Sequence, residues 1–74
     1  MTDKELLFKV SGGIKRLRIA KGFRSSERFA ECFGLNRVSY HRLESGSNTT
    51  LKTLNKILTI HELTFKEFCE QELR

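Results

Sequence analysis

Apolar residues recur every three or four positions through the first part of the chain and predict an amphipathic helix. This spacing places them on one face, as an apolar stripe. Asp3 can cap or begin this helix. Lys21-Gly22 suits its end, where a cation meets the negative pole of the helix and glycine can take the left-handed conformation. The stripe comprises Leu6, Leu7, Val10, Ile14 and Leu17.

A glycine pair, Gly12-Gly13, lies inside this stripe. Each glycine costs about 1 kcal/mol relative to alanine within a helix, so the helix either runs through the pair or breaks there. We expect a continuous helix, in which the two glycines allow another helix to pack closely.

The stretch 25–46, SSERFAECFGLNRVSYHRLESG, predicts two short helices joined by a tight turn. Ser25 and Asn36 can each cap a helix, because their side-chain oxygens accept hydrogen bonds from free amides of the first turn. Gly34 can end the first of the two helices, and the second covers residues 37–45. Two short helices joined by a glycine turn form a helix-turn-helix.

Two more helices are predicted after a polar loop. Thr50 can cap the fourth helix, and Thr64 with Glu67 has the spacing of a capping box for the fifth. His61 lies in the turn between them, where we expect it to be solvated. The apolar positions of these two helices are Leu51, Leu54, Ile57, Leu58, Phe65, Phe68 and Leu73.

The positive charge of the chain lies in its first part. Residues 1–46 contain ten Lys and Arg against five Asp and Glu, a net charge of +5, whereas residues 47–74 contain four of each. A basic surface on the helix-turn-helix suits a polyanion such as DNA. The alternative is a solvated basic surface that aids solubility.

Composition argues against several other classes of protein. The 74 residues suffice for one small domain, 1–74, and we expect a cytoplasmic protein because no long apolar run and no signal peptide is visible. Cys32 and Cys69 lie 37 positions apart, so we expect free, buried thiols and no zinc site. The sequence offers no nucleophile–base pair and no Gly-rich phosphate loop, so we expect neither catalysis nor a cofactor.

Several residues in and around the motif carry a family resemblance. They are Ala30, Gly34, Leu35, Tyr40, Leu43 and Glu44-Ser45-Gly46 in the motif, Ile14 to Arg18 and Lys21-Gly22-Phe23 before it, and Leu51 to Leu54 after it. Position by position, this set resembles the lambda-repressor-like (Cro/CI-type, XRE) family of helix-turn-helix proteins, over roughly residues 5–70. The resemblance implies an all-α, five-helix DNA-binding domain.

In this family the second helix of the motif enters the major groove, and its first turns meet the base edges. Carried over by position, the base-contacting residues are Arg37, Val38, His41 and Arg42. Arg37 suits a bidentate contact with O6 and N7 of guanine, whereas Val38 has packing beneath the turn as an alternative. Helix N-termini and nearby polar groups suit phosphate. We therefore expect phosphate contacts from Arg24, Ser25, Ser26, Asn36, Ser47, Asn48 and Thr49.

Arg18 and Glu44 match an arginine of the first helix and a glutamate at the end of the recognition helix. In the family these two side chains form a buried or half-buried ion pair, which suits the planar guanidinium and the carboxylate. The alternative for Arg18 is a contact with a phosphate of DNA.

The resemblance implies a sequence-specific transcriptional regulator that binds double-stranded DNA, more often a repressor. The alternatives are an antitoxin or restriction-modification controller of the same fold, with a protein partner, and an interaction module that has lost DNA binding. We also expect a weak homodimer through the C-terminal helix, with a monomer that pairs only on DNA as the alternative. The apolar residues available for the dimer are Ile60, Phe65, Phe68 and Leu73.

Overall fold

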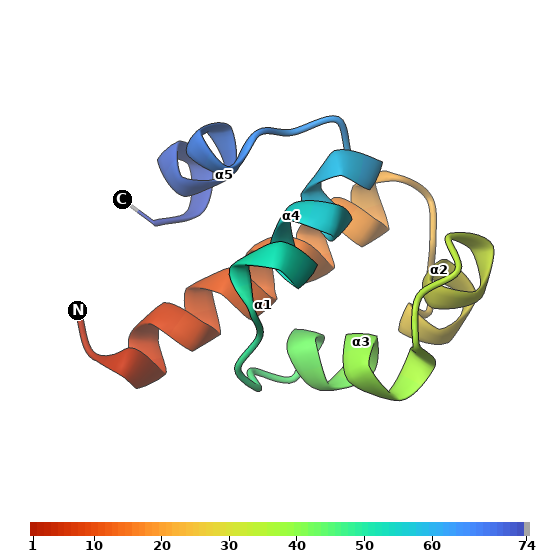
Figure 1. Cartoon of the computed structure of the whole chain (residues 1–74), viewed down its shortest axis with the longest axis horizontal. Helices are drawn as coiled ribbons and strands as arrows, with labels where there is room; N and C mark the ends of the chain where they lie inside the picture. The colour runs from red at the N-terminus through yellow and green to blue at the C-terminus, as the bar shows by residue number, and fades with distance from the viewer. Residues whose placement is uncertain (74) are drawn as a thin grey trace.

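The chain folds into five α-helices in a computed structural model, which describes residues 1–73 (Figure 1). The all-α prediction with five helices is confirmed, and no strand occurs in residues 1–73. The Cα atoms have a radius of gyration of 11.3 Å. The helices are α1 (Asp3–Ala20), α2 (Ser26–Cys32), α3 (Arg37–Glu44), α4 (Leu51–Ile60) and α5 (Phe65–Glu72).

A side-chain oxygen caps the start of every helix. In each case it accepts a hydrogen bond from the backbone amide three residues further on, and so satisfies one of the free donors of the first turn. The backbone amide of Thr64 donates in turn to Oε1 of Glu67 at 2.9 Å, so the predicted capping box of α5 is present. Asp3 is the first helical residue of α1, and the cap is the residue before it. The five caps are Thr2, Ser25, Asn36, Thr50 and Thr64.

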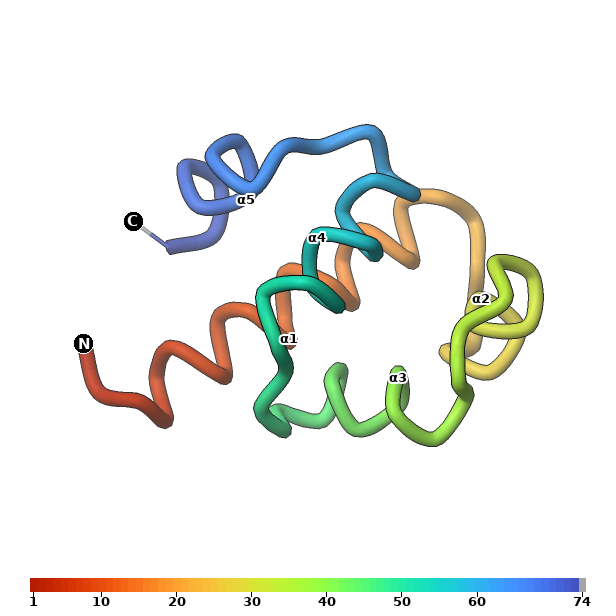
Figure 2. Tube along the Cα trace, viewed as in Figure 1, coloured from red at the N-terminus to blue at the C-terminus, as the bar shows by residue number. Residues whose placement is uncertain are grey.

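The long helix α1 is the element against which most of the chain packs. It contacts α2, α3 and α5, while α4 packs against α5. Figure 2 shows the trace leaving α1 for α2 and α3 and then returning through α4 to α5, so that both described ends of the chain lie on the same side of the molecule. The buried residues that form the hydrophobic core are Val10, Ile14, Phe29, Ala30, Tyr40, Leu43, Leu54, Ile57, Leu58 and Phe68.

Helix α1 runs through the Gly12-Gly13 pair without a break, as expected. Gly13 is buried beneath α5, where an added Cβ would lie 2.9 Å from the Phe68 ring and 2.7 Å from Cγ of Glu72. Those distances are shorter than ordinary carbon–carbon contacts. The absence of a side chain at Gly13 therefore lets α5 approach α1.

An aromatic cluster surrounds Phe29 and corrects one expectation. The ring of His61 is half-buried and stacks on Phe29, with ring centroids 5.2 Å apart and planes 5° from parallel, so the prediction that it is solvated was wrong. Nε2 of His61 is buried and has no hydrogen-bond partner in the described part of the chain. Burial, aided by the positive charge of Lys21, lowers the pKa of His61, because both disfavour the protonated ring. Phe23, Phe33 and Tyr40 complete the cluster.

The two cysteines are free thiols with different surroundings. Cys69 is partly buried on α5, but Cys32, at the end of α2, is exposed, so the expectation of two buried thiols was wrong for Cys32. Within residues 1–73, no group of three or more His, Cys, Asp or Glu is arranged to hold a metal ion. None of the helices described combines the length and the apolar character that crossing a membrane requires.

Candidate nucleic-acid interface

Helices α2 and α3 pack against each other across a turn at Gly34. Gly34 has a φ of +68°, in the left-handed region that glycine adopts at little cost. The backbone amide of Leu35 donates to the carbonyl oxygen of Ala30 at 2.8 Å and closes the turn. Ala30 is completely buried. A larger side chain at this position would therefore push the two helices apart.

The far end of α3 is tied to α1 by an ion pair between Arg18 and Glu44. Nε of Arg18 donates to Oε2 of Glu44 at 2.8 Å, and Nη2 donates to Oε1 at 2.9 Å. The third nitrogen, Nη1, donates to the backbone carbonyl of Phe23 at 2.8 Å. Hydrogen bonding to Glu44 raises the pKa of Arg18. All three nitrogens are engaged inside the protein, so Arg18 is not placed to contact phosphate.

Tyr40 lies beside this ion pair, on the buried face of α3. Its hydroxyl is also buried and lacks a hydrogen-bond partner among the described residues. Burial raises the pKa of Tyr40, and the neighbouring Glu44 carboxylate raises it further. The phenol therefore stays neutral, and Tyr40 belongs to the packing of α3 rather than to its outer surface.

The opposite face of α3 is open to solvent. Val38 is 61% exposed, so packing beneath the turn, the alternative considered for it, was wrong. Together with Ser26 and Glu27 of α2, this face borders a groove of about 520 Å³ between the two helices. All four residues expected to contact bases line this groove: Arg37, Val38, His41 and Arg42.

Arg37, at the start of α3, is held by two carboxylates of α2. Nη1 of Arg37 donates to Oε1 of Glu27 at 2.8 Å and to Oε1 of Glu31 at 3.2 Å. Neither glutamate was among the residues predicted for this interface. Their spacing of four residues on one helix was the available signal, since it places them on the same face. What the sequence did not reveal was that this face turns toward Arg37.

His41 contacts α2 one turn further along α3. Its Nδ1 lies 3.2 Å from Oγ of Ser26, within hydrogen-bonding distance. Ser26 was expected to bind phosphate, and in this structure its hydroxyl contacts the imidazole of His41. The contact joins one residue from the predicted base-contacting set with one from the phosphate-contacting set.

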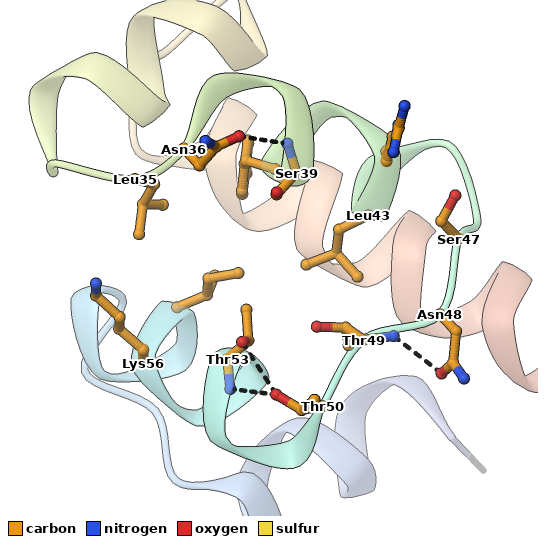
Figure 3. Close-up of a pocket in the computed structure, with 13 residues that line it drawn as sticks. Leu35, Asn36, Ser39, Leu43, Ser47, Asn48, Thr49, Thr50, Thr53 and Lys56 are labelled. Carbon is orange, nitrogen blue, oxygen red and sulfur yellow. Dashed lines mark hydrogen bonds between the residues drawn. The ribbon is translucent and has the colours of Figure 1, made fainter.

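A second groove, of about 580 Å³, runs between α3 and α4 (Figure 3). Of the residues expected to bind phosphate, Asn36, Ser47, Asn48 and Thr49 line it, and Arg42 borders both grooves. Lys56 of α4 also lines it, a residue that the sequence analysis did not select.

Two hydrogen bonds orient the amide side chains of the second groove. Oδ1 of Asn36 accepts from the amide of Ser39 at 2.9 Å, and Oδ1 of Asn48 accepts from the amide of Thr49 at 2.9 Å (Figure 3). With each carbonyl oxygen occupied, the –NH₂ group of each side chain is the part left to donate, and phosphate oxygens accept such donors.

Two other residues expected to bind phosphate, Arg24 and Ser25, lie outside both grooves. They are exposed in the segment before α2. Oγ of Ser25 accepts from the backbone amide of Arg28 at 3.0 Å as the cap of α2. The structure thus separates them from the loop after α3, which holds Ser47 to Thr49.

Comparisons of the chain with models of protein families, with curated proteins and with solved structures found no match.

Proposed function

We propose that this chain is a lambda-repressor-like helix-turn-helix protein that binds a specific DNA sequence and regulates transcription, as a repressor. The observation that carries the proposal is the open face of α3. Arg37, Val38, His41 and Arg42 lie together on it, while Tyr40 and Leu43 hold the opposite face in the core. In this proposal α2 and α3 are the helix-turn-helix, and α3 is the recognition helix.

The chemistry of that face suits the edges of base pairs. The major groove is about 12 Å wide, admits one α-helix, and displays acceptors on guanine and a methyl group on thymine. Arg37 and Arg42 supply guanidinium donors, and Val38 supplies an exposed apolar surface that suits the methyl group. His41 adds a ring nitrogen one turn from Arg37.

The groove between α3 and α4 suits the phosphate backbone beside the recognition helix. It presents side-chain amides, hydroxyls and the cation of Lys56, and none of the described residues that line it is Asp or Glu. Phosphate contacts fix the orientation of a protein on the duplex without reading its sequence. We assign this role to Asn36, Ser47, Asn48 and Thr49 in that groove, and to Arg24, Ser25 and Ser26 at the start of α2.

In this proposal the protein binds DNA as a weak homodimer. One recognition helix reads few base pairs, and two copies on a near-palindromic site place their helices about 34–36 Å apart. We assign the dimer contact to α5. Phe68 is fully buried and serves the core, and Ile60 and Leu73 pack against the core, so Phe65 is the main apolar residue that α5 presents to solvent.

Selection of duplexes from a random pool, at a stated salt concentration, tests the proposed function. We expect enrichment of one motif containing guanine, with binding that weakens as salt increases because phosphate contacts release counterions. A protein that enriches no motif, and binds every duplex equally, would contradict sequence-specific binding and favour the interaction module.

A further inference from the structure

The group formed by Arg37, Glu27 and Glu31 carries a net negative charge at the start of the proposed recognition helix α3. One guanidinium faces two carboxylates, so the three side chains together carry –1. They are 58%, 65% and 55% exposed respectively, and so accessible to a ligand. A carboxylate beside DNA is repelled by phosphate, and this placement therefore opposes simple backbone binding.

The geometry of the contacts shows what remains available on Arg37. Both glutamates bind the same nitrogen, Nη1. Nη2 and Nε of Arg37 take no part in these contacts, and two parallel donors on one edge of a guanidinium match O6 and N7 of guanine. The two carboxylates therefore bind the guanidinium of Arg37 through Nη1 alone and leave the edge formed by Nη2 and Nε available to a base.

We infer that Glu27 and Glu31 are specificity-determining residues, which position Arg37 for a guanine and keep it from the phosphate backbone. The inference rests on the proposed function and adds two residues of α2 to it. A phosphate at the free edge of Arg37 would add its negative charge beside two carboxylates, which repel it. A guanine edge carries no net charge and accepts from the free edge of Arg37 while both carboxylates stay in place.

The test compares the double variant Glu27→Gln, Glu31→Gln with wild type on three duplexes. These are the selected duplex, the same duplex with the guanine read by Arg37 replaced, and a random duplex. Without the carboxylates, Arg37 becomes a phosphate contact. We expect random-duplex binding to tighten about threefold and the slope of log K against log salt to steepen by about 0.9, the value for one added phosphate contact. Preference at the guanine should fall about threefold or more, a part of what one bidentate contact supplies.

A matched control separates positioning from the overall charge. The double variant Asp3→Asn, Glu62→Gln removes the same charge from two exposed positions, one at the start of α1 and one directly after α4. It should tighten binding to all duplexes equally and leave the guanine preference unchanged. In an Arg37→Ala background, the Glu27→Gln and Glu31→Gln changes should no longer alter that preference. Circular dichroism of each variant checks that the helices are retained.

The outcomes distinguish the inference from the proposal beneath it. If wild type prefers one duplex but both double variants change guanine preference to the same extent, the inference is overturned and the proposed function stands. The same holds if the effect of the Gln substitutions persists without Arg37. If wild type prefers no duplex, the proposed function is overturned and the inference falls with it.

Discussion

Arg18 on α1 and Glu44 at the end of α3 form a two-point ion pair, in which the side chains are only 5% and 7% exposed. The contact spans 26 residues of sequence and ties the outer end of α3 to the longest helix. A buried pair of this kind adds little net stability, because desolvation of both ions offsets their attraction. Removing one partner is costly, since it leaves the other charge buried and unpaired.

The first prediction concerns this pair. Arg18→Met or Glu44→Gln alone should lower the free energy of unfolding by about 3–5 kcal/mol, measured by urea denaturation. DNA binding should be lost through unfolding rather than through lost contacts. The double variant should cost less than the sum of the single variants, and a double-mutant cycle gives the coupling. Additive losses would show that the two side chains do not support each other in solution.

The second prediction concerns readout by Arg37. Arg37→Ala should cost about 1–3 kcal/mol on the selected duplex and relax the preference at one base pair. Lys56→Ala, in the second groove, should weaken all duplexes about equally and reduce the salt slope by about one, because it removes a phosphate contact. Equal loss of selected and random DNA in Arg37→Ala would remove Arg37 from the base-reading set.

The third prediction compares the two neighbouring glycines of α1. Gly13→Ala places a methyl group against Phe68 and Glu72, and overpacking of this kind costs about 1–3 kcal/mol. Gly12→Ala meets only the flexible end of Arg16, with the nearest atom 3.3 Å away. It should therefore gain up to about 1 kcal/mol from helix propensity. Thermal unfolding of both variants measures the difference, and equal effects would contradict the close packing of α5 on Gly13.

The fourth prediction is a pH dependence that arises from His61. Because the folded protein lowers the pKa of His61, the unfolded chain binds its proton more readily between the two pKa values. This contribution to stability is complete above the unfolded value of about 6.5 and is lost as pH falls toward the folded value. Urea unfolding between pH 8 and 5 should show the decline. His61→Phe should flatten the curve, because it removes the titrating ring, and an unchanged pH dependence in this variant would contradict the role of His61.

The fifth prediction concerns assembly through α5. Sedimentation of the free protein from micromolar to millimolar concentration should show a weak monomer–dimer equilibrium. Phe65, which is 42% exposed, should contribute to it, so Phe65→Ser should weaken dimerisation. Phe8→Ser removes an exposed phenylalanine from α1 and is the matched control. A strict monomer that selects an asymmetric half-site would exclude the dimer.

The sequence by itself determined where the helices begin, because those signals are local. A hydroxyl or amide oxygen three residues before a free amide is enough to cap a helix, as at Ser25, Thr50 and Thr64. A glycine is enough to end one, as at Gly34. The residues of the open face of α3 were selected differently, by position from the family resemblance, and Tyr40 and Leu43 lie buried on the face opposite to them.

Only the tertiary structure decided which faces of different helices meet. It turned Glu27 and Glu31 toward Arg37, stacked His61 on Phe29, and buried Phe68 while leaving Phe65 exposed. Each outcome depends on the rotation and separation of two helices. These are set by packing summed over many side chains, and by the close approach at Gly13, rather than by any short stretch of residues. Helical periodicity specifies a face, but it does not specify what that face contacts.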